Sequence, residues 1–299
     1  MPVFAAQKMA AAQTILLDGP LGTELAVRGV PTPPPQWSGE AINTAPRVIE
    51  AIHRDYALAG ATVHTAATFR THARQAGPGW EALTARAVAL TRGAIPRHHL
   101  VAGSIAPLED CYRPDLSPLD SRPEHRAIAR ALARSGVDLL LCETFPHVGE
   151  ALVAVEEAVA TGLLVWASFT AGHRADLLTP IEVGHAARAA VARGASAVLV
   201  NCIPATRTLP YVEQLATAGV PFGAYANAGA PEEALGWDTA REPVACARAA
   251  RVYAELASTW RAVGATLLGG CCGTGPAHIA ALAASITPPS APRFPSEAG

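Results

Sequence analysis

Eight short runs rich in apolar and β-branched residues recur along this chain, and alanine-rich segments with the apolar spacing of helices lie between them. This alternation predicts parallel strands joined by crossover helices. Eight such units in 299 residues match the size of a single (β/α)8 TIM barrel. We expect the strands at residues 15–19, 61–68, 99–106, 138–145, 163–170, 196–203, 222–227 and 265–270.

The segments between the strands support the same fold class. A doubly wound open sheet is the alternative, but its G-x-G-x-x-G fingerprint is missing after the first strand, where the chain reads DGPLGTEL. The proline-rich segment 28–40 is expected to cover the barrel mouth, and 107–123 is a second long loop. We expect the barrel to occupy residues 1–286, before a Pro- and Ser-rich, poorly ordered tail at 287–299. The expected helices include 45–60, 122–136, 147–161, 181–194, 206–218 and 244–263.

Composition and charge exclude several classes of function. The net charge is −2 and no basic cluster with interleaved aromatic residues occurs, which argues against nucleic acid as a partner. No apolar stretch reaches the length of about 18 residues that a membrane helix needs. Six cysteines without the spacing of a disulfide framework favour a reducing compartment, so a cytoplasmic enzyme acting on small molecules is expected. The oligomeric state does not follow from the sequence.

Polar residues stand where the predicted strands end. In a (β/α)8 barrel, the carboxyl ends of the strands and the loops after them form the active site. For any single residue, a helix cap or a loop-closing role is the alternative. Their convergence at one end of the barrel favours a site, and its candidates are Asp18, Gly22, Thr23, Glu143, Asn201, Cys202, Asn227, Cys271 and Cys272.

The three cysteines in this set have the chemistry of a metal site. Cys271 and Cys272 are adjacent in GGCCGTGPAHI, and Cys202 closes the apolar run SAVLVNC. Three thiolates without a fourth protein ligand suit a catalytic Zn²⁺ with an open position. A strained disulfide between neighbours and an inert buried pair are the alternatives.

Adjacent side chains of a strand point to opposite faces, so both cysteines can face one metal only if the strand ends there. Gly273 supplies backbone freedom for such a turn, and His278 is expected in the following helix, turned away from the site. A thiolate-rich zinc is a poor activator of water but holds a substrate thiol as a thiolate. The sequence therefore suggests attack by a metal-bound substrate thiolate.

Five motifs together resemble the homocysteine S-methyltransferase family: DGPLGTEL (18–25), ETFP (143–146), NC (201–202), YANAG (225–229) and GGCCGT (269–274). The resemblance spans residues 15–282. It implies a zinc-containing (β/α)8 barrel that methylates homocysteine to methionine. It also implies that Cys202, Cys271 and Cys272 ligate zinc and that the homocysteine sulfur completes the tetrahedron.

The resemblance also assigns roles to residues around the metal. Asp18 and Glu143 match acidic residues that hold the homocysteine amino group. Gly22 and Thr23 match a loop whose backbone amides receive its carboxylate. The positions of Asn201 and Asn227 support the pocket.

The methyl donor is expected to be an onium compound, because its leaving group is neutral and needs no cobalamin. Trp37 resembles a tryptophan that lies near the donor, with loop packing as the alternative, and Trp37 and Phe145 offer aromatic faces to a cation. The ETFP motif and the compact length favour S-methylmethionine over betaine, although Ala226 and the ATFR segment (67–70) depart from relatives of either type. The alternatives are methylation of another small thiol or selenol at the same site, and a non-catalytic thiol- or zinc-binding barrel.

Overall fold

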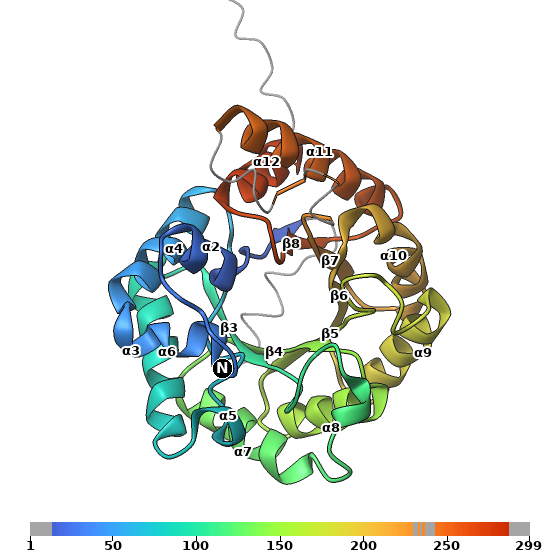
Figure 1. Cartoon of the computed structure of the whole chain (residues 1–299). Coiled ribbons are helices and arrows are strands. Elements are labelled where there is room, and N and C mark those ends of the chain that lie inside the picture. The colour runs from blue at the N-terminus through green and yellow to red at the C-terminus, as the bar shows by residue number, and fades with distance from the viewer. Residues whose placement is uncertain (1–13, 230–232, 234, 237–242, 287–299) are drawn as a thin grey trace, which may run out of the picture.

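The fold is a nearly closed barrel of eight parallel strands surrounded by helices, as predicted (Figure 1). The computed structural model describes residues 14–229, 233, 235–236 and 243–286. The strand order is β1-β8-β7-β6-β5-β4-β3-β2, and a bridge between Leu17 and Val63 connects the first strand to the second. The strands are β1 (Ile15–Leu16), β2 (Val63–Thr65), β3 (Leu100–Ile105), β4 (Leu139–Phe145), β5 (Leu164–Phe169), β6 (Ala197–Pro204), β7 (Phe222–Asn227) and β8 (Leu267–Gly270).

Helices form the outer ring around these strands (Figure 1). Each of the six expected helices has a counterpart: α4 (Pro46–Leu58), α7 (Arg122–Arg134), α8 (Val148–Val159), α9 (Pro180–Val191), α10 (Leu209–Leu215) and α11 (Pro243–Ala262). The other helices are α2 (Leu21–Val27), α3 (Ala41–Thr44), α5 (Ala73–Ala76), α6 (Trp80–Ala94) and α12 (Pro276–Ile286). Short 3₁₀ turns are η1 (Trp37–Gly39), η2 (Pro114–Leu116), η3 (Ala205–Arg207) and η4 (Ala216–Ala218).

The predicted lengths of the first two strands need correction, and the predicted end of the domain stays open. β1 and β2 are shorter than expected, although single backbone hydrogen bonds from Asp18 N to Val63 O and from Ala66 N to Ala102 O continue beyond the paired residues. The predicted tail at 287–299 lies outside the described residues, so the domain boundary at residue 286 stays a prediction.

Two apolar layers hold the barrel together. Successive side chains of a strand point to opposite faces, so each strand supplies both layers. On β4, Leu139 and Leu141 pack inside the barrel, whereas Leu140 and Cys142 pack against the helices. Between β7 and β8 the backbones come so close that a Cβ at Gly223 would lie 1.7 Å from the Leu267 carbonyl oxygen.

Helix starts follow local rules of capping. In α9, the Thr179 side chain accepts a hydrogen bond from the backbone N–H of Glu182, while the Glu182 carboxylate accepts one from the Thr179 N–H. Pro180 occupies the first turn, where it sacrifices no intrahelical bond. Within the described residues, no helix has the length and apolar character needed to cross a membrane.

Candidate metal centre and substrate cavity

The carboxyl ends of the strands surround a cavity of about 790 Å³. The expected cover is present, since Thr32, Trp37 and Ser38 from the proline-rich segment line it. The second long loop also contributes to its wall. The predicted site residues that line it are Asp18, Gly22, Thr23, Trp37, Glu143, Cys202, Asn227, Cys271 and Cys272.

The three predicted cysteines converge at this cavity. Their sulfur atoms all lie within 4.8 Å of one another, and Cys202 Sγ is 3.9 Å from Cys272 Sγ. Zn–S bonds of about 2.3 Å in a tetrahedron place two sulfurs about 3.8 Å apart. The spacing and the soft donor set therefore fit a tetrahedral metal ion with its fourth position open to the cavity.

A bulge in β6 presents Cys202 to the cavity. Pairing between β6 and β7 shifts between Asn201 and Pro204, and Cys202 adopts a left-handed backbone with φ of 56°. That conformation costs a non-glycine residue about 1–3 kcal/mol and is often found at functional sites. Without the bulge, alternation would direct Cys202 toward the helices.

β8 ends directly before the adjacent Cys271 and Cys272, as predicted. The strand stops at Gly270, and the Cys271 N–H donates to the Ala226 carbonyl at 2.8 Å. The chain then turns through Gly273, whose φ is 79°. His278 lies in α12 and hydrogen-bonds to Leu235 and Gly275, away from the sulfurs, as expected.

The thiols influence one another strongly. Hydrogen bonds with Cys202 and Cys272, together with burial, raise the pKa of Cys271. Hydrogen bonds with Cys202 and Cys271 lower the pKa of Cys272. The three thiols therefore titrate together, and a bound divalent cation would stabilise all three as thiolates.

Tyr112 and Cys111 are among the lining residues that the sequence analysis did not predict. Tyr112 places its hydroxyl 2.9 Å from Cys202 Sγ, and its ring meets His173 edge to face at 5.0 Å. Cys111 also lines the cavity, so a fourth thiol lies at this end of the barrel. Cys111 is nevertheless not part of the group of closely spaced sulfurs.

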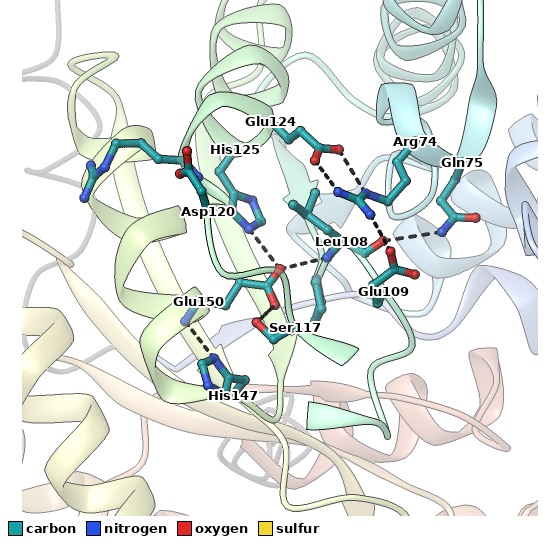
Figure 2. A network of polar contacts seen from close by, with 12 residues as sticks. Arg74, Gln75, Leu108, Glu109, Ser117, Asp120, Glu124, His125, His147 and Glu150 are labelled. Carbon is teal, nitrogen blue, oxygen red and sulfur yellow. Dashed lines mark hydrogen bonds and ion pairs between the residues drawn. The ribbon is translucent and has the colours of Figure 1, made fainter. Parts of the chain in front are cut away.

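Buried polar contacts fix the loop that carries Tyr112 (Figure 2). Glu150 of α8 accepts hydrogen bonds from Leu108 N at 2.8 Å and Ser117 Oγ at 2.6 Å, and it pairs with His125 Nε2 at 3.0 Å. Burial opposes ionisation, but these contacts hold the pKa of Glu150 below its usual value. The carboxylate therefore ties both ends of the loop to α7 and α8.

Glu143 is the acidic group best placed for a cationic substrate. Its carboxylate accepts hydrogen bonds from Ser104 Oγ at 2.5 Å and Tyr225 Oη at 2.9 Å. Burial raises the pKa of Glu143 to about 7, although the two hydrogen bonds oppose the shift. A cation bound beside it would favour the ionised form.

The β1 to α2 segment differs from the predicted loop. Gly22 and Thr23 lie in α2, and Thr23 Oγ1 accepts a hydrogen bond from the Gly273 N–H at 3.1 Å. Asp18 Oδ2 accepts from the Thr65 N–H at 3.0 Å. The segment that was expected to bind the substrate carboxylate is therefore also connected to the cysteine turn.

Asn201 and Phe145 do not line the cavity, which contradicts the predicted role of Phe145 as an aromatic face for the donor. Asn201 is buried and hydrogen-bonded to Thr144 and Ser168, so it supports the site from behind. Phe145 is buried beside His125, where a bulge in β4 has turned it toward the helices. Its proposed contact with the donor is therefore wrong.

The lining of the cavity combines aromatic and cationic side chains. Trp37 is 40% exposed and lines the cavity together with Phe69 and Tyr112. Arg174 also lines the cavity and supplies the cationic side chain. Asn227 also faces the cavity, and its buried Oδ1 has no hydrogen-bond partner among the described residues.

Comparison with known proteins identifies the family of this chain. The model of the homocysteine S-methyltransferase family matches residues 15–286. The chain belongs to the homocysteine S-methyltransferase family. A homocysteine S-methyltransferase of Escherichia coli K12 is 33% identical over 298 residues, which cover 90% of this chain and 94% of the relative.

Two further relatives bear on the fold and the substrates. The metallated form of the E. coli homocysteine methyltransferase MmuM superposes with a TM-score of 0.75 at 28% identity, covering 95% of this chain and 99% of the other. The mouse S-methylmethionine–homocysteine S-methyltransferase BHMT2 is 29% identical, covering 84% of this chain and 73% of that protein. This family member is accordingly a methyltransferase whose small-molecule substrate is homocysteine.

Proposed function

We propose that this enzyme transfers a methyl group from an onium donor, preferentially S-methylmethionine, to the thiolate of homocysteine in a zinc-dependent reaction that yields methionine. The observation that carries the proposal is the sulfur triangle of Cys202, Cys271 and Cys272 at the floor of a cavity. Zinc, when bound there, keeps the incoming thiol in its nucleophilic thiolate form at neutral pH.

The surrounding residues would orient homocysteine with its sulfur toward the cysteines. Glu143 offers a buried carboxylate for the substrate ammonium, and Tyr225 and Ser104 hold that carboxylate in place. The backbone of Gly22 and Thr23 is the expected partner of the substrate carboxylate. Holding the amino acid at two points aligns the sulfur for attack and lowers the entropic barrier.

The chemical step needs no proton transfer. The thiolate sulfur attacks the methyl carbon, a new carbon–sulfur bond forms, and the bond from methyl to the onium atom breaks. The bonding electrons leave with a neutral thioether or tertiary amine. The protein's task is therefore to align the two reactants and to exclude water from the cavity.

The cavity lining suits an onium donor that also carries a carboxylate. Trp37, Phe69 and Tyr112 provide aromatic faces, which attract a sulfonium or quaternary ammonium group. Arg174 can pair with a carboxylate at the far end of the donor. S-methylmethionine and betaine both have this combination, and the ETFP motif favours the former.

Mass spectrometry of the products tests the proposal directly. The zinc-loaded enzyme is incubated with homocysteine and, in turn, S-methylmethionine, betaine or methyltetrahydrofolate plus cobalamin. We expect methionine with S-methylmethionine and no turnover after zinc removal. Turnover with betaine alone would change the donor, and turnover only with the folate and cobalamin would reject the mechanism. Competition with small thiols and selenols tests the alternative acceptors, and tight zinc and homocysteine binding without turnover would favour a non-catalytic barrel.

A further inference from the structure

A second group of metal-ligating atoms lies beside the cavity, apart from the cysteines. Asp18 follows β1, His64 belongs to β2 and His53 to α4. His53 Nδ1 is 3.7 Å and His64 Nδ1 is 4.0 Å from Asp18 Oδ2, and the three ligand atoms lie within 4.8 Å of one another. The exposed fractions of Asp18, His53 and His64 are only 5%, 1% and 0%.

Neither His53 Nδ1 nor His64 Nδ1 makes a hydrogen bond of normal geometry among the described residues, although the His64 ring also lies near the Ala61 backbone. The separations of 3.7 and 4.0 Å are too long for direct hydrogen bonds to the carboxylate. Buried polar atoms without partners are rare and point to a missing ligand. Two such atoms converge here on one carboxylate oxygen.

The opposite ring nitrogen of His53 indicates which atoms carry protons. His53 Nε2 lies 3.1 Å from Thr91 Oγ1, and Thr91 Oγ1 donates to the Ala87 carbonyl at 3.1 Å. Because a hydroxyl has only one hydrogen, Thr91 must accept from His53 Nε2–H when it donates to Ala87. In this tautomer, His53 Nδ1 carries no hydrogen and directs a lone pair toward Asp18.

His64 can present the same kind of donor atom. Its Nε2 is 3.1 Å from His99 Nδ1, so one of these two nitrogens supplies the hydrogen. When His64 Nε2 supplies it, His64 Nδ1 is also a lone pair facing Asp18. Two lone pairs and a carboxylate oxygen would repel one another unless a positive species lies between them.

We propose that Asp18, His53 and His64 form a second site for a divalent transition-metal ion, distinct from the cysteine centre. Two imidazoles and one carboxylate are a donor set that such ions prefer. Bonds of about 2.1 Å would bring tetrahedral ligand atoms to about 3.4 Å. His53 Nδ1 and His64 Nδ1, at 3.7 and 4.0 Å, must therefore move about 0.3 and 0.6 Å closer to Asp18 Oδ2. Asp18 borders the large cavity, which gives the ion a route to the site.

The position of this site suggests its effect. An ion there would join β1, β2 and α4 at the turn that leads into α2. Asp18 would be held through Oδ2, which also accepts from the Thr65 N–H. The ion would thus fix the segment beside the homocysteine pocket without taking part in methyl transfer.

Cobalt binding can separate the two sites, because thiolate ligands give Co²⁺ intense charge-transfer absorption and histidine or carboxylate ligands do not. The metal-free enzyme and its Cys202→Ser/Cys271→Ser/Cys272→Ser variant are titrated with Co²⁺, dialysed and analysed for metal. We expect two equivalents in the wild type and one in the triple variant, whose spectrum lacks the thiolate band.

Adding His53→Ala and His64→Ala to the triple variant should abolish the remaining equivalent. His185→Ala, which removes an exposed histidine of α9, is the matched control and should leave it unchanged. Circular dichroism checks the fold of each variant. Pulsed EPR of Cu²⁺ bound to the triple variant, whose histidines are intact, should show couplings to imidazole nitrogens.

Three results would each overturn the proposal: no cobalt in the folded triple variant, cobalt unaffected by the loss of both histidines, or copper without nitrogen coupling. A water molecule or a shared proton would then occupy the space between the three side chains. If the histidine variants fail to fold, the stoichiometry and EPR of the triple variant still decide.

Discussion

Homocysteine binding should depend on pH through Glu143. Burial raises the pKa of this carboxyl to about 7, so near neutral pH it is only partly ionised. The substrate ammonium requires the ionised form, because a protonated carboxyl offers it no negative charge. Only the ionised fraction of the enzyme is therefore competent to bind the amino group.

The size of the effect follows from that pKa. With a pKa of about 7, roughly 90% of Glu143 is ionised at pH 8 and about 9% at pH 6. The apparent dissociation constant equals the intrinsic one divided by the competent fraction. Homocysteine should therefore bind about tenfold more weakly at pH 6 than at pH 8 through this group alone.

Binding of the substrate thiol to the metal would also release a proton and would add its own pH dependence. A control ligand with the same thiol but without the amino group separates the two effects. 4-Mercaptobutanoate has the thiol and carboxylate of homocysteine but lacks the amino group. Titration calorimetry of the zinc-loaded enzyme gives the dissociation constant of homocysteine divided by that of 4-mercaptobutanoate. The contribution of the thiol cancels in this ratio. That ratio should rise about tenfold from pH 8 to pH 6.

Glu143→Gln provides the protein control, because an amide of the same shape does not ionise. The ratio should become independent of pH in this variant. Homocysteine affinity should fall by about 2 to 5 kcal/mol, since one partner of a buried charge pair is lost. A ratio that stays flat in the wild type, or an unchanged affinity in the variant, would refute the role of Glu143.

The remaining predictions concern the metal, the donor and the loop. Cys202→Ser should lose most of the bound zinc in metal analysis, whereas Cys142→Ser, which alters a thiol packed against the helices, should retain it. Trp37→Ala should raise the Michaelis constant for the donor and leave that for homocysteine nearly unchanged. Arg174→Gln should raise the Michaelis constant for S-methylmethionine but not that for trimethylsulfonium, which has no carboxylate. Equal effects on the two donors would reject a contact between Arg174 and the donor carboxylate. The pKa of Glu150 is lowered in the folded state, so its contribution to stability is present above the usual carboxyl range and is lost as pH falls through the folded pKa. Thermal melts of the wild type and Glu150→Gln should accordingly converge at low pH, and a constant difference would contradict this.

The barrel could be predicted because its strands and main helices have clear periodicity, but α2 could not. Its sequence begins after Gly19 and Pro20 and contains Gly22, which is a poor helix former. Tertiary contacts stabilise it instead: Leu25 is fully buried, and Arg28 pairs with Glu24 at 3.0 Å. Local propensity therefore predicted a loop where packing produces a helix.

The grouping of Cys202, Cys271 and Cys272 could be predicted because closely placed thiols have few other uses, whereas the position of Tyr112 could not. It lies in a loop without periodicity, and its position depends on Glu150, a residue 42 positions from Leu108 in sequence. Phe145 was misassigned for a different reason. Regular alternation from Leu141 would direct its ring into the barrel, but the bulge after Cys142 turns it outward.

Asn201 connects the bulge in β6 to the bulge in β4 through hydrogen bonds to Thr144. The sequence did not indicate this structural role. Asn201 Oδ1 accepts from the Thr144 N–H at 3.1 Å, and its Nδ2 donates to Thr144 Oγ1 at 2.8 Å. Thr144 and Cys202 are the two left-handed residues of these strands, with φ of 62° and 56°. Each conformation is unfavourable alone, so both persist only where surrounding contacts enforce them. Because Asn201 precedes Cys202 and hydrogen-bonds to the residue after Glu143, a single buried amide fixes the Cys202 thiol and the Glu143 carboxylate relative to each other.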